Sequence, residues 1–201
     1  MAEPSLPKTL LQMAGANLAP ATWAESALIL IDCQNEYLDG MLPLTGVVPA
    51  LDQCALLLAG ARKAGAPVFH IRHKGKAGSA FDWDARGGAI ADAVAPDEAE
   101  AVVAKGLPNS FAGTELADLV KASGRPKLVV AGFMTHMCVS TTTRAALDLG
   151  YFSTVVAGAC ATRDLPDGHG GVVKAADLHR AELAALSDRF CVVAPDAGTI
   201  A

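Results

Sequence analysis

Short runs of apolar residues, separated by stretches rich in alanine and leucine, most constrain the fold of this chain. The runs are nearly continuous in valine, isoleucine and leucine, and they cover 27–32, 67–72, 101–105, 127–132, 153–157 and 190–194. Strands that are buried on both faces have this character, whereas half-exposed strands alternate apolar with polar residues. The sequence therefore predicts a parallel β-sheet.

The stretches between these runs predict the helices that connect parallel strands. Helical patterns cover 51–64, 114–122, 138–149 and 172–186, and the first three end close to a glycine, which is a helix stop signal. Strands that alternate with helices indicate an α/β fold with right-handed crossovers. We expect residues 1–22, rich in proline and alanine, to be a loosely docked lead-in segment and residues 23–201 to form a single domain.

Composition excludes several classes of function. The 201 residues carry a formal net charge of −5 without a basic tract, so we expect no nucleic-acid partner. No apolar run reaches the roughly 18 residues of a membrane span, and no secretory signal is visible, so we expect no membrane partner and a cytoplasmic location. Five cysteines without close metal-ligand spacing favour free thiols in a reducing compartment.

Three reactive side chains follow predicted strands. Asp32 ends the first run, Lys105 ends the third, and Cys138 follows the fourth by a short turn, where it would open a helix. Because ligands of parallel sheets bind beyond the carboxyl ends of the strands, we expect these side chains to converge there. Taken singly, each has an ordinary interpretation: a turn carboxylate, a solvated lysine and a small core residue.

Together the three side chains have a coherent chemistry. A helix start and a nearby ammonium stabilise a thiolate, so we expect Lys105 to favour the charged form of Cys138. Asp32 can accept the thiol proton and later return it to a leaving amine. Backbone N–H groups of the turn before the helix can stabilise an oxyanion.

Three segments that carry these residues resemble the isochorismatase-like cysteine hydrolases, which include nicotinamidases, N-carbamoylsarcosine amidohydrolases and streptothricin hydrolases. The segments are ALILIDCQNEYLDG with Asp32, VVAKGLPNSFAGTEL with Lys105, and LVVAGFMTHMCVSTTTRAALDLGY with Cys138. The resemblance covers residues 24–195. It implies a three-layer α/β fold, in which helices cover both faces of a six-stranded, mostly parallel sheet.

The resemblance also implies the parts of an active site. Asp32, Lys105 and Cys138 would form a catalytic triad, and the reaction would pass through a covalent acyl intermediate on Cys138. The peptide bond between Phe133 and Met134 would be cis, and the backbone N–H groups of Met134 and Cys138 would form the oxyanion hole. Nicotinamidases bind a metal through an Asp-x-His pattern after the second strand, where this chain reads His73-Lys74-Gly75, so we expect no metal and no cofactor.

The long connection 73–100 and several aromatic residues are the candidates for a substrate pocket. His73 would lie at its rim, and His136 either shapes the nucleophile turn or contacts substrate. For the aromatic residues, core packing is the alternative interpretation. The predicted substrate-binding residues are Gln34, Tyr37, Trp83, Phe111, Phe133 and His136, with Phe81 as a further possible wall.

The sequence thus predicts a cysteine hydrolase that cleaves a carbon–nitrogen bond of a small molecule, which it does not identify. Two alternatives remain: vinyl-ether hydrolysis of the isochorismatase type, which needs no thiol, and a non-catalytic binding or thiol-sensing protein on the same fold. Either the connection 73–100 or a neighbouring subunit would close the pocket, since members of this family are commonly oligomeric and we expect a homo-oligomer.

Overall fold

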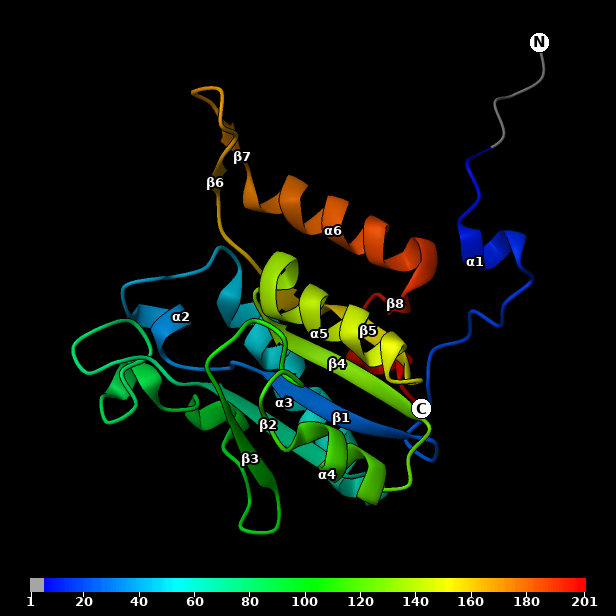
Figure 1. The fold of residues 1–201 in the computed structure, drawn as a ribbon, viewed down its shortest axis with the longest axis horizontal. Coiled ribbons are helices and arrows are strands. Elements are labelled where there is room, and N and C mark those ends of the chain that lie inside the picture. The colour runs from blue at the N-terminus through cyan, green and yellow to red at the C-terminus, as the bar shows by residue number, and fades with distance from the viewer. Residues whose placement is uncertain (1–5) are drawn as a thin grey trace.

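Six parallel strands form the central sheet of the computed structural model, which describes residues 6–201. Their spatial order is β3-β2-β1-β4-β5-β8, and every neighbouring pair is parallel, which confirms the predicted sheet (Figure 1). The strands are β1 (Ser26–Ile31), β2 (Val68–His73), β3 (Ala101–Lys105), β4 (Lys127–Phe133), β5 (Phe152–Ala161) and β8 (Cys191–Ala194). The direction of strand addition reverses between β1 and β4, so this pair marks the switch point where such sheets bind ligands.

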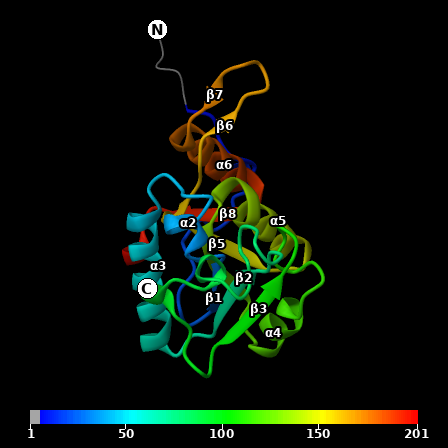
Figure 2. The ribbon, with the colours of Figure 1, turned by 90° about the vertical axis from the view of Figure 1, so that its left-hand side faces the viewer.

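Helices cover both faces of the sheet, as the sequence predicts (Figure 2). The long helix α3 lies on one face, and α4, α5 and α6 supply apolar residues to the cluster on the other face. Their bounds are α3 (Val47–Ala64), α4 (Leu116–Ala122), α5 (Ser140–Asp148) and α6 (Ala175–Arg189), with short helices α1 (Leu10–Met13) and α2 (Glu36–Asp39). The chain therefore folds into three layers.

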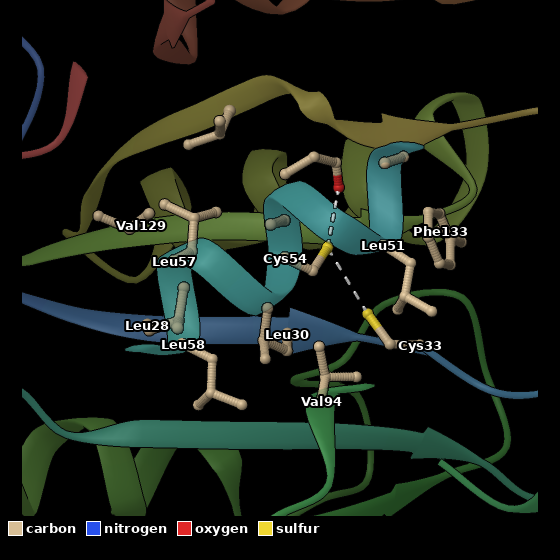
Figure 3. Packing of buried hydrophobic residues seen from close by; sticks show 14 of the residues in the cluster. Leu28, Leu30, Cys33, Leu51, Cys54, Leu57, Leu58, Val94, Val129 and Phe133 are labelled. Atoms are coloured by element: carbon tan, nitrogen blue, oxygen red, sulfur yellow. Dashed lines mark hydrogen bonds between the residues drawn. The ribbon is translucent and has the colours of Figure 1, made fainter. Parts of the chain in front are cut away.

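Each face of the sheet has its own apolar cluster, because successive residues of a strand point to opposite faces. Leu28 and Leu30 of β1 pack against Cys54, Leu57 and other residues of α3 (Figure 3). The alternate residues of β1 pack against side chains of α4, α5 and α6 on the opposite face. Strands buried on both faces explain why the apolar runs in the sequence are continuous.

Three of the predicted helices begin later than the sequence indicates, and the helix predicted at 51–64 begins earlier, at Val47. The helix predicted at 114–122 starts at Leu116. The predicted helix 138–149 begins instead as a π-helical turn, Thr135–Val139, and α5 starts at Ser140. The predicted helix 172–186 starts at Ala175, because β7 (Val172–Val173) pairs antiparallel with β6 (Leu165–Pro166). A pair of valines fits a helix or a strand equally well, and only the pairing with a distant segment decides between them.

The described part of the lead-in is tied to the domain by backbone hydrogen bonds. The N–H of Leu10 in α1 donates to Asp188 of α6, and the N–H of Ala21 donates to the buried hydroxyl of Thr154 in β5. The first five residues of the lead-in predicted at 1–22 lie outside the described residues. Among residues 6–201, no helix is both long and apolar enough to cross a membrane.

Near the carboxyl ends of β1 and β4, the backbone of Ile31 leaves no room for a side chain on the paired residue of β4. Gly132 of β4 has a φ of +117°, and a Cβ atom at this position would lie 2.1 Å from the carbonyl oxygen of Ile31 in β1. Only glycine is compatible with both the backbone angle and the contact. This glycine therefore sets the spacing between the two strand ends that precede Asp32 and Cys138.

Candidate active site

Three strand ends bring Asp32, Lys105 and Cys138 together. Asp32 follows β1 with a φ of +50°, a left-handed conformation that Asp adopts more readily than most residues. Lys105 is the last residue of β3, and Cys138 lies in the π-helical turn after β4. Because β2 separates β3 from β1, the lysine side chain must extend past the end of β2 to reach Asp32.

The three side chains are in direct contact in a buried site. Lys105 Nζ lies 2.7 Å from Asp32 Oδ2 and donates a hydrogen bond to Cys138 Sγ at 3.3 Å. Relative exposure is 0% for Asp32, 2% for Lys105 and 5% for Cys138. Removing an ion pair from water is costly. The attraction between the two charges offsets this cost when they face each other directly.

Burial controls the protonation of this site. Burial raises the pKa of Asp32, against the opposing attraction of the Lys105 ammonium. Burial, and next the negative charge of Asp32, raise the pKa of Cys138 to about 12, while Lys105 acts in the opposite sense. Lys105 therefore favours the thiolate, as expected, but burial and the charge of Asp32 outweigh its influence, so the thiol keeps its proton in the resting site.

The backbone around Cys138 forms a tight turn. The peptide bond between Phe133 and Met134 is cis, at the position that the resemblance implies. The carbonyl of Met134 accepts hydrogen bonds from the N–H groups of Met137 and Val139, which closes the turn. The backbone N–H groups that were predicted to form the oxyanion hole belong to this turn.

Side chains at the end of β5 and on α6 anchor the same turn. His136 Nδ1 lies 2.6 Å from the hydroxyl of Thr162, which follows β5. The Thr135 hydroxyl donates to the carbonyl of Ala161 at 3.2 Å and lies 2.9 Å from His179 Nδ1. Of the two roles considered for His136, this contact favours the shaping of the turn. Sequence reasoning missed Thr162 and His179, because neither lies near Cys138 in the chain.

Gln34 is buried and tied to the backbone of the connection that follows β2. Its amide nitrogen donates to the carbonyls of His73 at 3.0 Å and Gly88 at 2.7 Å, and its amide oxygen accepts from the N–H of His73 at 2.8 Å. Both amide hydrogens are therefore used within the protein. Gln34 fixes the end of β2, and a substrate contact from it would have to use the amide oxygen.

Three aromatic side chains pack next to the triad. The ring centroid of Tyr37 lies 5.0 Å from that of Phe81 and 5.8 Å from that of Phe133, both in edge-to-face geometry. Phe81 also packs edge-to-face on His73, at 5.2 Å. Burial raises the pKa of Tyr37, and the charge of Asp32 raises it further, which places this residue beside the carboxylate.

The two other aromatic candidates lie in different surroundings. Phe111 belongs to the apolar cluster that also contains Cys138. Trp83 stacks on the guanidinium of Arg72, 3.6 Å from the ring centroid, and lines a cavity of about 660 Å³ with residues of 74–84. No triad residue lines that cavity, so the structure does not bring Trp83 to Cys138.

The remaining cysteines are all buried, and the sulfur atoms of two of them, Cys33 and Cys54, lie 3.9 Å apart. Cys33, Cys54, Cys160 and Cys191 are buried free thiols, like Cys138 itself. Over residues 6–201, no three His, Cys, Asp or Glu side chains gather in a way that could hold a metal ion. The polar groups of the site are therefore the triad, His73 and the backbone of the turn.

Comparison with known proteins agrees with this architecture. A model of the isochorismatase domain matches residues 26–196. An isochorismatase family protein of Bacillus subtilis is 39% identical over 84% of this chain and 94% of its own length. The crystal structure of an isochorismatase from Pseudomonas putida superposes with a TM-score of 0.93 at 41% identity, covering 98% of this chain and all of that one. The chain therefore belongs to the isochorismatase family of hydrolases.

Proposed function

We propose that this hydrolase cleaves a carbon–nitrogen bond of a small molecule through an acyl intermediate on Cys138. The observation that carries the proposal is the position of Lys105 Nζ, which contacts both Asp32 Oδ2 and Cys138 Sγ inside a buried site. A carboxylate, an ammonium and a thiol in mutual contact are the groups that acyl transfer through a cysteine requires.

Two relatives have names that state a hydrolase activity, and one of these names states the bond type. A streptothricin hydrolase of Streptomyces noursei is 33% identical over 94% of this chain and 77% of its own length. The maleamate amidohydrolase of Pseudomonas putida is 32% identical over 67% of this chain and 70% of its own length. The second of these names states hydrolysis of an amide. Amide-type substrates are therefore the first class to test.

The acylation half of the reaction uses Asp32 twice. Its carboxylate removes the thiol proton of Cys138, and the sulfur forms a bond to the carbonyl carbon of the substrate. The oxyanion that develops accepts hydrogen bonds from the N–H groups of Met134 and Cys138. The C–N bond then breaks, and the Asp32 carboxyl gives its proton to the departing nitrogen, which leaves a thioester on Cys138.

The deacylation half repeats these steps with water. Asp32 removes a proton from water as the water oxygen attacks the thioester carbon, the C–S bond breaks, and the proton returns to the sulfur. The net reaction consumes one water and releases an acid and an amine or ammonia. Lys105 stays protonated throughout and faces the carboxylate and the sulfur, so its charge favours each state in which either one is anionic.

The raised pKa values fit this proton shuttle. A carboxylate whose pKa lies above the ordinary value is a stronger base than a solvent-exposed aspartate. A thiol whose pKa is raised to about 12 keeps its proton in the resting site, so its attack on a substrate needs the neighbouring carboxylate as a base. The pKa values of Asp32 and Cys138 are therefore both shifted upward, as expected for a thiol that attacks with the help of a carboxylate base.

A panel of small amides, with intact-mass detection of the protein, tests this function. We expect one substrate to add the mass of its acyl group to the wild-type chain and to leave no adduct on the Cys138→Ala variant. Cys191→Ala is the matched control, because Cys191 is a buried thiol on β8, which β5 separates from β4, and this variant should form the adduct. Turnover by Cys138→Ala equal to wild type, on an amide or on a vinyl ether, would show that the thiol is not the nucleophile.

A further inference from the structure

We propose that His73 is a positioning residue of this site: its neutral imidazole accepts a hydrogen bond from the Lys105 ammonium and so holds that cation between Asp32 and Cys138. The inference rests on the proposed function of the triad and adds a residue to it. His73 touches neither the nucleophile nor the base in this role, and acts through Lys105.

The geometry around Lys105 Nζ is the first argument. This nitrogen forms an ion pair with Asp32 Oδ2 at 2.7 Å and lies within hydrogen-bond distance of Cys138 Sγ at 3.3 Å and His73 Nδ1 at 3.5 Å. An ammonium has three N–H donors and no acceptor, so three such neighbours match its donor number. Without His73, one donor of a lysine that is only 2% exposed would lack this acceptor, which is costly for a buried charge.

The second argument is the charge state that the contact requires. His73 can accept a hydrogen bond at Nδ1 only if it is neutral and carries its hydrogen on Nε2. A protonated imidazole 3.5 Å from Lys105 Nζ would place two cations together in a buried site. The charges of Lys105 and Asp32 therefore act on the protonation of His73. The imidazole must stay neutral for this arrangement to persist.

The third argument is that other residues hold His73 rigidly. Gln34 binds both the N–H and the carbonyl of His73, and the register of the sheet pairs His73 with Lys105 itself. The ring of Phe81 packs on the imidazole from the outer side. The imidazole can therefore serve as a fixed point for the long and otherwise flexible lysine side chain.

The charged groups that face His73 come from two elements. They are Asp32 after β1 and Lys105 on β3, whereas Phe81 from the connection is apolar. Burial lowers the pKa of His73, Lys105 lowers it further and Asp32 opposes them. At neutral pH these influences together favour the neutral imidazole that the contact needs.

Two variants separate positioning from packing. His73→Phe keeps a ring against Phe81 and removes the acceptor, whereas His73→Asn removes the ring and keeps an acceptor oxygen close to the position of Nδ1. On the amide that the panel identifies, we expect His73→Phe to lower kcat by about tenfold to a hundredfold with little change in KM, because Lys105 is misplaced. His73→Asn should recover most of that kcat. The reverse order, with Phe active and Asn inactive, would show that the ring serves packing alone and would overturn the proposal.

A spectroscopic measurement decides the same question without turnover. In wild-type protein labelled with ¹⁵N-histidine, and with His73 assigned from the His73→Asn spectrum, we expect Nδ1 to be unprotonated and Nε2 to carry the hydrogen. The titration midpoint of this ring should lie below the ordinary value and should rise in Lys105→Met. A hydrogen on Nδ1, or a midpoint unmoved by Lys105→Met, overturns the proposal even if the proposed reaction is correct. The expected tautomer and midpoint shift support it even if no amide is turned over.

Discussion

Two buried thiols on opposite faces of the sheet have different neighbours. Cys54 on α3 is fully buried, with the carbonyl of Ala159 at 3.3 Å and the sulfur of Cys33 at 3.9 Å (Figure 3). Cys138 is 5% exposed, with Lys105 Nζ at 3.3 Å and Asp32 beside it. The contact with Cys33 and burial raise the pKa of Cys54, and burial raises that of Cys138. Both thiols are therefore protonated near neutral pH.

The comparison shows that a shifted pKa does not by itself identify a nucleophile. What distinguishes Cys138 is a base that can take its proton and a cation that stabilises the anion formed. Cys54 has only a neutral carbonyl and a second thiol within reach. The functional difference between these thiols therefore lies in the charges around them, and each prediction below tests whether that difference is real.

The largest effect is expected from removing each sulfur in turn. Cys138→Ala should lower turnover by about 10⁴-fold or more, because the nucleophile of a catalytic unit is lost. Cys54→Ala should keep turnover within a few-fold of wild type. Steady-state kinetics of the two variants measure this, and equal losses in both would abolish the distinction between the two thiols.

Removing the base without the thiol should have the next largest effect. Asp32→Asn should lower kcat by about 10²- to 10⁴-fold, the usual contribution of general acid–base catalysis. Asparagine tolerates the left-handed backbone at this position, so the variant should fold and give the circular dichroism spectrum of wild type. A folded Asp32→Asn enzyme with full turnover would remove Asp32 from the mechanism.

The same variant, Asp32→Asn, should lower the pKa of Cys138. The thiolate should therefore form more readily in this variant even though its turnover is lower. The Asp32 charge raises the pKa of Cys138 and Lys105 lowers it, so loss of the carboxylate should lower the pKa. The pH midpoint of alkylation by iodoacetamide, followed by intact mass, should therefore move down by about one unit or more in Asp32→Asn. The midpoint of Cys54 should not move. An upward shift at Cys138 would mean that the carboxylate favours the thiolate.

The smallest effect concerns stability on the opposite face. Cys54→Ala deletes a fully buried sulfur from the apolar cluster beneath α3 and should cost about 1 kcal/mol of unfolding free energy. Urea denaturation at neutral pH measures this change. A Cys54→Ala variant that is as stable as wild type and yet inactive would show that Cys54 serves the reaction and not core packing.

The fold was more predictable than the surroundings of the site. Continuous apolar runs predicted the six strands, since burial on both faces leaves a strong local signal, and β3 has the predicted bounds of 101–105. The π-helical turn before α5 and the pairing of β6 with β7 were not predicted. Both depend on contacts between segments that are distant in the chain, which no local pattern encodes.

The site residues divide in the same way. Asp32, Lys105 and Cys138 could be brought together from the sequence because each follows a strand and parallel strands end at one edge. The strand order could not be deduced, so neither the passage of Lys105 across the end of β2 to reach Asp32 nor its contact with His73 was foreseen. Trp83 was predicted to bind substrate only because aromatic residues are rare in this chain. In the structure its ring stacks on the guanidinium of Arg72.

Gly132 shows that a residue without a side chain can determine the relative positions of catalytic groups. Any larger residue would collide with the carbonyl of Ile31 and force β1 away from β4, which would separate Asp32 from Cys138 while leaving both in place in the chain. A substitution there would look like a catalytic defect although no reactive group had changed. In a search for natural variants that lose activity, this glycine is therefore as informative as the triad itself.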